Sequence, residues 1–184
     1  PHDSHRRQRQ MCIRDSGLAR QRHFPAINWL NSYSLYPQSL NQWFRDNIAS
    51  DFPEVRTEIS ALLKVEAELQ EIVQLVGSDA LPMDQQLTLE VARMIRVYFL
   101  QQNGFDPVDA YSGVEQQYAM ARAILTFQEE AKKAMAAGAV LEDVVNVPAR
   151  IELMRARFAE GYLEKIEGLV EEMVSQIGNS VEAQ

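Results

Sequence analysis

A stripe of apolar residues that recur every three or four positions runs from Asp51 to Gly77 and is the clearest pattern in the chain. Charged residues, Glu66 among them, lie away from this stripe, so the spacing predicts an amphipathic helix with one buried face. Asp51 and Glu54 have the spacing of a capping box. Pro53 suits a first helical turn, and Gly77 permits the left-handed backbone that ends a helix. The predicted buried face consists of Val55, Ile59, Leu62, Val65, Leu69, Ile72 and Val76.

The same periodicity predicts further helices along the rest of the chain. They cover residues 38–48, 83–102, 114–137, 141–145 and 148–177. Gly161 and Gly168 are expected to weaken the last of these helices locally. The buried faces of the three long helices are predicted to hold Leu87, Val91, Met94 and Tyr98; Met120, Ile124, Phe127, Ala131 and Met135; and Ile151, Met154, Phe158, Tyr162, Ile166, Leu169 and Met173.

The arrangement of these helices follows from their apolar stripes. No segment alternates apolar and polar residues as a half-buried strand does, and each helical stripe must be covered by another element. We therefore predict an all-α fold, with a helical bundle over residues 37–184. Residues 17–36 hold Pro25 and several aromatic, Ser and Asn residues, and are predicted to form an irregular connector.

The composition is that of one globular domain, since the 184 residues are 46% hydrophobic and 24% charged. The formal net charge of -8 disfavours nucleic acid as a partner, because an acidic surface repels phosphate. No apolar run approaches the roughly 18 residues of a membrane span. No segment has the pattern of a signal peptide, and a single Cys cannot form an internal disulfide.

The first sixteen residues, PHDSHRRQRQMCIRDS, differ from the rest of the chain because they are basic and show no periodicity. Residues 6–16 can be encoded by codons that resemble a transposase adapter used in sequencing libraries. We therefore expect residues 1–16 to be translated adapter, non-native and disordered, and native residues upstream to be missing. A disordered basic tail that binds anions is the alternative. Because the segment holds four Arg and two Asp, the rest of the chain has a net charge of -10.

The sequence lacks the motifs of common catalytic sites. It has no G-x-x-x-x-G-K-[ST] loop to bind a triphosphate, and neither HExxH nor CxxC occurs. His23 stands alone beside Phe24 and Pro25, and a lone His is more often a packing or capping residue than a metal ligand. The residues alone therefore indicate a helical interaction domain with no catalytic residue and no metal site.

A resemblance to a known family begins at residues 25–34, PAINWLNSYS. They are similar to a signature of rotary ATPase subunits: Pro, a small residue, an aliphatic residue, Asp or Asn, three variable residues, then Ser-x-Ser. The wider run ARQRHFPAINWLNSYSLY resembles the A subunit of V/A-type enzymes, since F-type β subunits usually have Asp at position 28 and lack Trp29. In that family the segment leads from the nucleotide-binding domain into the helical domain; simple packing within a connector is the alternative. The signature residues are Pro25, Ala26, Ile27, Asn28, Ser32 and Ser34.

The resemblance covers residues 18–138 and includes a helix-loop-helix at residues 72–95. This segment is similar to the one that carries the acidic DELSEED loop of F-type β subunits, which presses on the central stalk. Charges at a wet surface are screened within about 8–10 Å, and only two carboxylates are present here. We therefore expect a steric push through Leu81, Pro82 and Met83; an ordinary helix-helix turn is the alternative. The implied rotor-contact residues are Asp79, Ala80, Leu81, Pro82, Met83 and Asp84.

Residues 99–109, FLQQNGFDPVD, resemble the family's loop in which an aromatic side chain packs on the adenine ring of ATP. This implies that Phe105 contacts adenine, with Gln102 near the edge of the base. Phe99 is expected in the core instead. Gly104 stands where the family often has Ala, which implies a looser loop. The alternative role for Phe105 is a buried anchor of the loop.

The resemblance implies that the chain is the C-terminal part of the catalytic A subunit of a V/A-type ATP synthase, coupling ATP hydrolysis or synthesis to rotor rotation and to proton or sodium transport. The implied partners are the B subunit and the central-stalk subunits of an A3B3 assembly. ATP or ADP with Mg is implied for the full-length protein, and none of these for this segment, which is expected to be inactive alone. The implied location is cytoplasmic, peripheral to the membrane. A stand-alone helical scaffold is the alternative, and the QQNGFDPVD loop disfavours the non-catalytic B subunit.

Overall fold

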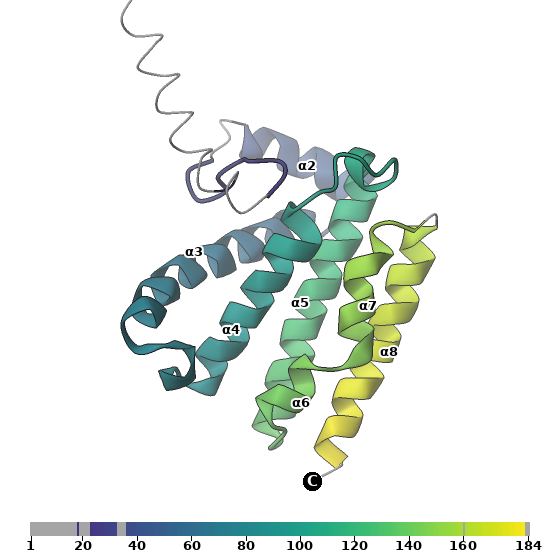
Figure 1. The fold of residues 1–184 in the computed structure, drawn as a ribbon. Coiled ribbons are helices and arrows are strands. Elements are labelled where there is room, and N and C mark those ends of the chain that lie inside the picture. Colours follow the sequence, from purple (N-terminus) through teal and green to yellow (C-terminus); the bar gives the residue numbers. More distant parts are fainter. Residues whose placement is uncertain (1–17, 19–22, 33–35, 160, 183–184) are drawn as a thin grey trace, which may run out of the picture.

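The computed structural model describes Leu18 and residues 23–32, 36–159 and 161–182, and it is built from helices packed side by side (Figure 1). No strand occurs among these residues, so the predicted all-α fold is confirmed. The adapter-like segment at residues 1–16 lies outside the described part of the chain. None of the described helices combines the length and the apolar character needed to cross a bilayer.

The helices follow the predicted order closely. Four predicted helices are confirmed to within about a residue at each end. In chain order the helices are α2 (Pro37–Asn47), α3 (Phe52–Val76), α4 (Met83–Met94), α5 (Val114–Ala136), α6 (Leu141–Val145), α7 (Pro148–Ala156) and α8 (Tyr162–Glu182). Two 3-10 turns, η1 (Ser78–Ala80) and η3 (Asp109–Tyr111), and a π-helical segment, η2 (Ile95–Leu100), complete the described elements.

Helix α5 forms the centre of the molecule, with α3 and α4 on one side and α7 and α8 on the other (Figure 1). Its predicted apolar face is confirmed, because Met120, Ile124, Phe127 and Ala131 are all buried. The face predicted for α4 is confirmed too. These two faces supply much of the apolar core, whose burial is the main force that holds such a bundle together.

The register predicted for α3 was partly wrong. Leu63 and Glu66 are buried, whereas Val65, Ile72 and Val76 of the predicted stripe are 43%, 44% and 59% exposed. The Glu66 carboxylate is accommodated because Arg96 Nη2 lies 2.7 Å from its Oε1. Burial raises the pKa of Glu66 above its ordinary value of 4.5, and the attraction of Arg96 partly opposes this shift.

The predicted capping box at the start of α3 is not formed. Asp51 makes no side-chain cap; its carboxylate instead accepts a 2.7 Å hydrogen bond from the hydroxyl of Tyr118 on α5. Burial is the main cause, and this hydrogen bond the second, that raises the pKa of Tyr118 to about 12. Glu54 pairs with Arg45, and the hydrogen bond from that guanidinium lowers the pKa of Glu54. Both carboxylates therefore join α3 to neighbouring helices.

The predicted long helix at residues 148–177 is wrong, because the structure divides it into α7 and α8, which pack against each other. Gly161 adopts φ +73°, a left-handed conformation that costs other residues about 1–2 kcal/mol. The glycine thus reverses the chain rather than weakening a continuous helix. The buried face of α7 differs in consequence: Leu153 is buried, and the predicted Ile151 is 47% exposed.

Helix α4 does not stay α-helical to residue 102 as predicted. Its last part, η2, has π-type hydrogen bonding, and the amide of Gln101 donates to the carbonyl of Arg96 at 2.9 Å. In an α-helix that amide would bond to Val97 instead. The shift leaves the Val97 carbonyl open to a donor from another part of the chain, as π segments at functional sites often do.

The buried Glu66 leads to a pH-dependent stability. Because the folded protein holds this proton more tightly than the unfolded chain, the stability from Glu66 is full below the unfolded pKa and is lost as the pH rises through the folded pKa. We expect the unfolding free energy of the unsubstituted chain to fall relative to Glu66→Gln as the pH rises above 4.5, the ordinary pKa of a Glu carboxyl. Urea unfolding at several pH values measures this. Glu68→Gln, an exposed change on the same helix, is the control; a pH-independent difference for Glu66→Gln would contradict the assignment.

Candidate functional site

Two exposed features lie at opposite ends of the helical segment that α4 and η2 form (Figure 1). One is the turn between α3 and α4, at residues 77–82. The other is the α4–α5 loop, residues 101–113. At 1.5 Å per helical residue they lie about 25 Å apart along the segment. A single helical segment therefore connects the two features.

The α3–α4 turn presents most of the predicted rotor-contact residues to solvent. Asp79 and Ala80 lie in η1 and are exposed, as are Pro82, Met83 and Asp84. Leu81 is the exception, because it is only 7% exposed and packs inward. The expectation that Leu81 makes a steric contact with a partner is therefore corrected: Leu81 anchors the turn from inside.

A group of apolar side chains lies exposed beside this turn, which we call the apolar tip: Leu75, Val76 and Met83. Leu75 is 85% exposed, and its place in this group was not predicted because it falls off the predicted stripe of α3. The signal that could have identified it is an apolar residue that lies off the stripe, close to the Gly that ends the helix. Exposed apolar side chains gathered at one end of a helix pair are candidates for contact with a partner.

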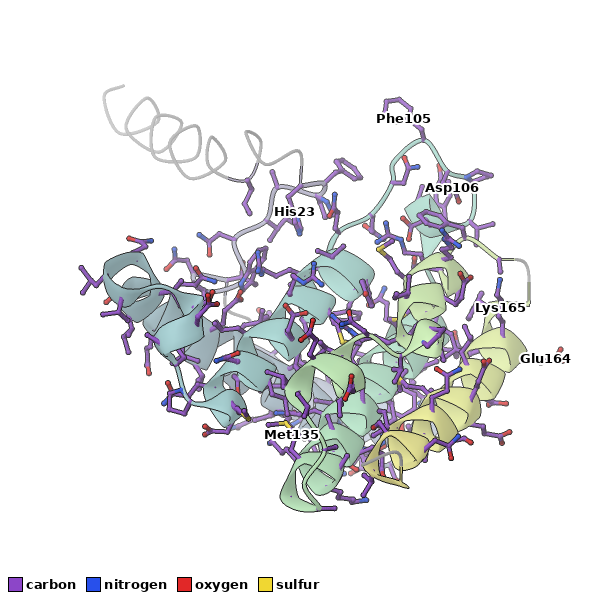
Figure 2. The ribbon with its side chains drawn as sticks, turned by 60° about the horizontal axis from the view of Figure 1, so that its bottom comes forward. His23, Phe105, Asp106, Met135, Glu164 and Lys165 are labelled. Atoms are coloured by element: carbon purple, nitrogen blue, oxygen red, sulfur yellow. The ribbon has the colours of Figure 1, made fainter. Side chains whose placement is uncertain are left out.

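The α4–α5 loop carries Phe105 at its outermost point, and Figure 2 shows the ring directed away from the bundle. The side chain is 101% exposed. Its backbone amide donates 3.1 Å to Oδ1 of Asn103, which fixes the turn beneath it. The alternative in which Phe105 is a buried anchor is thus contradicted. Phe99, in contrast, packs against the core as expected.

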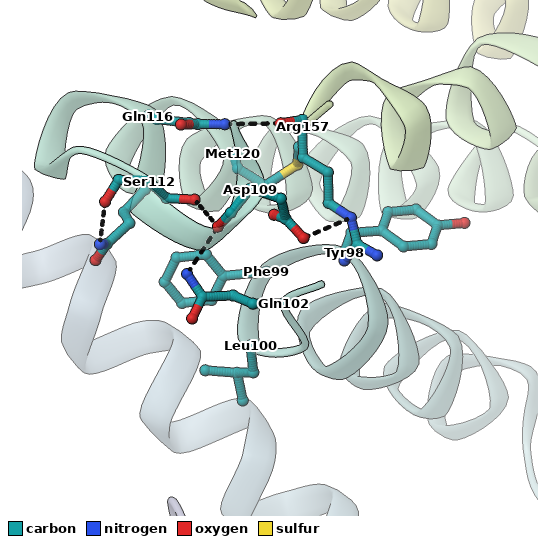
Figure 3. A pocket seen from close by; sticks show the side chains of 10 residues that line it. Tyr98, Phe99, Leu100, Gln102, Asp109, Ser112, Gln116, Met120 and Arg157 are labelled. Atoms are coloured by element: carbon teal, nitrogen blue, oxygen red, sulfur yellow. Dashed lines mark hydrogen bonds and ion pairs between the residues drawn. The ribbon is translucent and has the colours of Figure 1, made fainter. Parts of the chain in front are cut away.

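Gln102 lies on the inner side of the same loop. Its backbone amide donates 2.6 Å to the carbonyl of Phe24, and its side-chain Nε2 donates 3.2 Å to the carbonyl of Asp109 (Figure 3). The structure therefore does not bring Gln102 and Phe105 to one face. The Gln102 side chain therefore bonds to another residue of the same loop, Asp109. Its backbone amide bonds to the connector, at Phe24.

The connector packs closely on the loop. A Cβ added at Gly104 would lie 3.1 Å from the Phe24 ring, tighter than an ordinary contact. Gly104 thus allows the ring to approach the backbone. Two segments far apart in sequence hold each other in place.

A buried ion pair supports the loop from below. Arg157 Nε lies 3.7 Å from Oδ2 of Asp109, and the two side chains are 12% and 3% exposed (Figure 3). Burial lowers the pKa of Arg157, and the carboxylates of Asp109 and Asp106 oppose that shift. Neither member of the pair was predicted from the sequence, because 48 positions separate them and each lies next to ordinary loop or helix residues.

A small pocket lies around this pair, lined by residues that include Tyr98, Gln102, Asp109 and Arg157 (Figure 3). Its volume is about 180 Å³. Ligand pockets usually measure roughly 300–1,000 Å³. The pocket is therefore too small for a whole nucleotide.

The signature residues form a turn in the connector. Asn28 Oδ1 accepts hydrogen bonds from the amides of Leu30 and Asn31, at 3.0 and 3.3 Å. Ser32 Oγ donates 2.6 Å to the carbonyl of Asn28. Of the remaining signature residues, Ile27 is exposed and Ser34 lies outside the described residues. Asn28 and Ser32 therefore have a structural role here, because they close the turn through their own side chains.

His23 joins the connector to the end of α4. Its Nε2 lies 3.3 Å from the carbonyl of Arg96, its Nδ1 lies 3.2 Å from that of Pro25, and its ring is 5.3 Å from Trp29. Both nitrogens face backbone carbonyls, which supports the expected packing role. No group of His, Cys, Asp and Glu able to hold a metal ion occurs in the described part of the chain.

Comparison with known proteins agrees with this architecture. Residues 41–145 match the family model described as the C-terminal domain of V and A type ATP synthase. The chain is 48% identical over 159 residues to the A subunit of the A-type ATP synthase of Methanosarcina barkeri, covering 86% of this chain and 28% of that protein. It is 51% identical over 163 residues to the corresponding A subunit of Natronomonas pharaonis, covering 89% and 28%.

A bacterial relative matches as well. The V-type ATP synthase alpha chain 1 of Clostridium tetani is 49% identical over 146 residues, covering 79% of this chain and 25% of that protein. The chain thus spans about a quarter of the length of the relatives it matches. The matched family segment includes the α3–α4 turn and the α4–α5 loop, and it covers more than half of the chain. The chain therefore belongs to the family of C-terminal domains of V- and A-type ATP synthases.

Proposed function

We propose that this chain is the helical lever of a catalytic A subunit, which couples ATP hydrolysis or synthesis to rotation of a central stalk and to ion transport. Support comes from the relatives named as A subunits and from the placement of two exposed features at the ends of one helical segment. The relatives are much longer than this chain, and we assign the phosphate- and Mg-binding residues to the part of the protein outside it.

The lever must be stiff to transmit a displacement, and the structure supplies ties between its helices. The Glu66–Arg96 pair joins α3 to η2, and Arg150 Nη2 lies 2.6 Å from Oε2 of Glu90, which joins α7 to α4. Both pairs are at least partly withdrawn from water, where ion pairs are screened less than on the surface. When the nucleotide-binding domain closes, the bundle moves as a rigid body.

The apolar tip makes the contact with the rotor in this proposal. Leu75, Val76 and Met83 are the exposed apolar residues at the far end of the lever. Asp79 and Asp84 also lie there, but at a wet surface their charges act only within about 8–10 Å. The push is therefore steric. The partners are the central-stalk subunits at the tip and the B subunit at the side, within an A3B3 ring at the cytoplasmic side of the membrane.

The α4–α5 loop faces the nucleotide in the same scheme. Phe105 offers a fully exposed ring whose position is fixed by the backbone around it. Stacking on a base needs no hydrogen-bond pattern, since every base has a π face. Gln102 is engaged with the loop itself, so we assign the adenine contact to Phe105 alone.

The adenine contact is tested by Phe105→Ala in the full-length protein within its complex. Loss of the stack should raise the KM for ATP by roughly 5- to 150-fold, equivalent to about 1–3 kcal/mol, with kcat little changed. Tyr111→Ala is the matched control, because this aromatic in the same loop is 86% exposed and is assigned no contact. Equal effects of the two substitutions, or none from Phe105→Ala, would remove the assignment.

The rotor contact is tested by replacing Leu75, Val76 and Met83 together with Ser. Because the tip is exposed, the fold and ATP hydrolysis should persist, while ion transport per ATP hydrolysed should fall. The measurement is proton or sodium uptake into vesicles, divided by the hydrolysis rate. Asp79→Asn with Asp84→Asn should leave this ratio unchanged, since the push is steric. A normal ratio in the apolar variant would favour a scaffold with no role in coupling.

A further inference from the structure

Arg157 connects three parts of the chain that are distant in sequence. It follows α7, and its Nη1 donates 2.7 Å to the carbonyl of Val97 and 2.6 Å to that of Gln101. These carbonyls belong to the end of the lever, where the π-type bonding leaves Val97 without its usual amide donor. Nε of the same guanidinium faces Asp109 in the α4–α5 loop. One side chain therefore holds the lever, the loop and the α7–α8 turn.

Asp109 also bonds to the residues that flank Phe105 in the loop, Asn103 and Asp106, which we call the stem of the loop. Its Oδ2 accepts a 2.5 Å hydrogen bond from the amide of Asn103. The side-chain Oδ1 of Asn103 in turn accepts a hydrogen bond from the amide of Phe105. Asp106 lies on the other side of Phe105. Its Oδ1 accepts hydrogen bonds from the amides of Val108 and Asp109, at 2.9 Å each. The Phe105 ring is fully exposed. Its direction is consequently set by the stem beneath it.

We propose that the Arg157–Asp109 pair is a positioning device that holds Phe105 ready for the adenine ring and so sets the affinity of the protein for its nucleotide. This inference rests on the proposed adenine contact of Phe105. Arg157 and Asp109 are positioning residues, since neither reaches the outer face of the loop. Without the pair the stem has more conformations, and ordering it on binding opposes affinity.

The first experiment measures the loop directly in the assembled complex without nucleotide. Hydrogen exchange of peptides from residues 101–113 should be faster in Asp109→Asn than in the unsubstituted complex, with exchange in α5 unchanged. Asp143→Asn, an exposed aspartate on α6, is the matched control and should change neither. Unchanged exchange in the loop of Asp109→Asn would overturn the proposal.

A second variant covers the case in which a lone buried charge disturbs the fold. Asp109→Asn leaves Arg157 without its carboxylate, and removing one partner of a buried pair is often strongly destabilising. Arg157→Met with Asp109→Asn removes both charges and avoids that penalty. It should fold and assemble, and its loop should still exchange faster, because the hydrogen bonds that Arg157 donates to the carbonyls of Val97 and Gln101 are lost. Arg155→Met, an exposed arginine on α7, is the control for the methionine.

The functional readout is a double-mutant cycle on the KM for ATP. Asp109→Asn should raise KM by roughly five- to tenfold, the lower part of the range for stacking on a base, with kcat unchanged. In combination with Phe105→Ala it should add nothing, because the positioned ring is already gone. Additive effects would show that the pair acts independently of Phe105 and would overturn the inference.

The outcomes separate this inference from the function on which it rests. If Phe105→Ala leaves KM unchanged, the adenine contact itself fails, whatever Asp109→Asn does. If Phe105→Ala raises KM and Asp109→Asn does not, the adenine contact stands and the positioning role fails. The expected result is a KM increase in both single variants and no further increase in the double variant.

Discussion

The carbonyls of Val97 in η2 and of Gln101, the first residue of the loop, both accept hydrogen bonds from one distant side chain, that of Arg157. Backbone carbonyls withdrawn from water are nearly always paired in folded proteins. Arg157 supplies the donor for Val97 and Gln101, and Asp109 balances its charge within the low-exposure site. Asp109 also accepts a hydrogen bond from the amide of Asn103. The same ion pair therefore stabilises both the end of η2 and the stem of the loop.

Three buried or half-buried arginines tie α4 and η2 to the rest of the bundle in the same manner. Arg96 reaches Glu66 on α3, Arg150 reaches Glu90 from α7, and Arg157 reaches the π segment from the end of α7. Apolar contacts in the core are non-directional and tolerate sliding of one helix on another. A guanidinium with fixed donor geometry does not, so these contacts set the register of the lever while the core supplies its stability.

The features that could be predicted from the sequence are those with a local period. The stripes of α4 and α5, with Leu87 and Phe127 at their centres, and the glycine after α3 follow from spacing and backbone conformation alone. The division of the last predicted helix at Gly161 and the π segment have no such local period. Glu66 was assigned to the solvent face because its partner Arg96 lies thirty positions away, and the distance from Asp109 to Arg157 is greater still. Phe105 and the signature were found through the family resemblance, which says nothing of buried partners.

In the proposed mechanism, the loop that contacts the nucleotide and the tip that pushes the rotor need not move together merely because they share a helix. A flexible joint at the π segment would let the loop follow the nucleotide while α4 stayed still. Arg157 restrains that joint. Its Nη1 donates hydrogen bonds both to the carbonyl of Val97 in η2 and to the carbonyl of Gln101, the first residue of the loop. Rotation of the loop against the helix would break at least one of these two hydrogen bonds. That loss favours displacement of the loop and the lever as one body, as a steric push at the apolar tip requires.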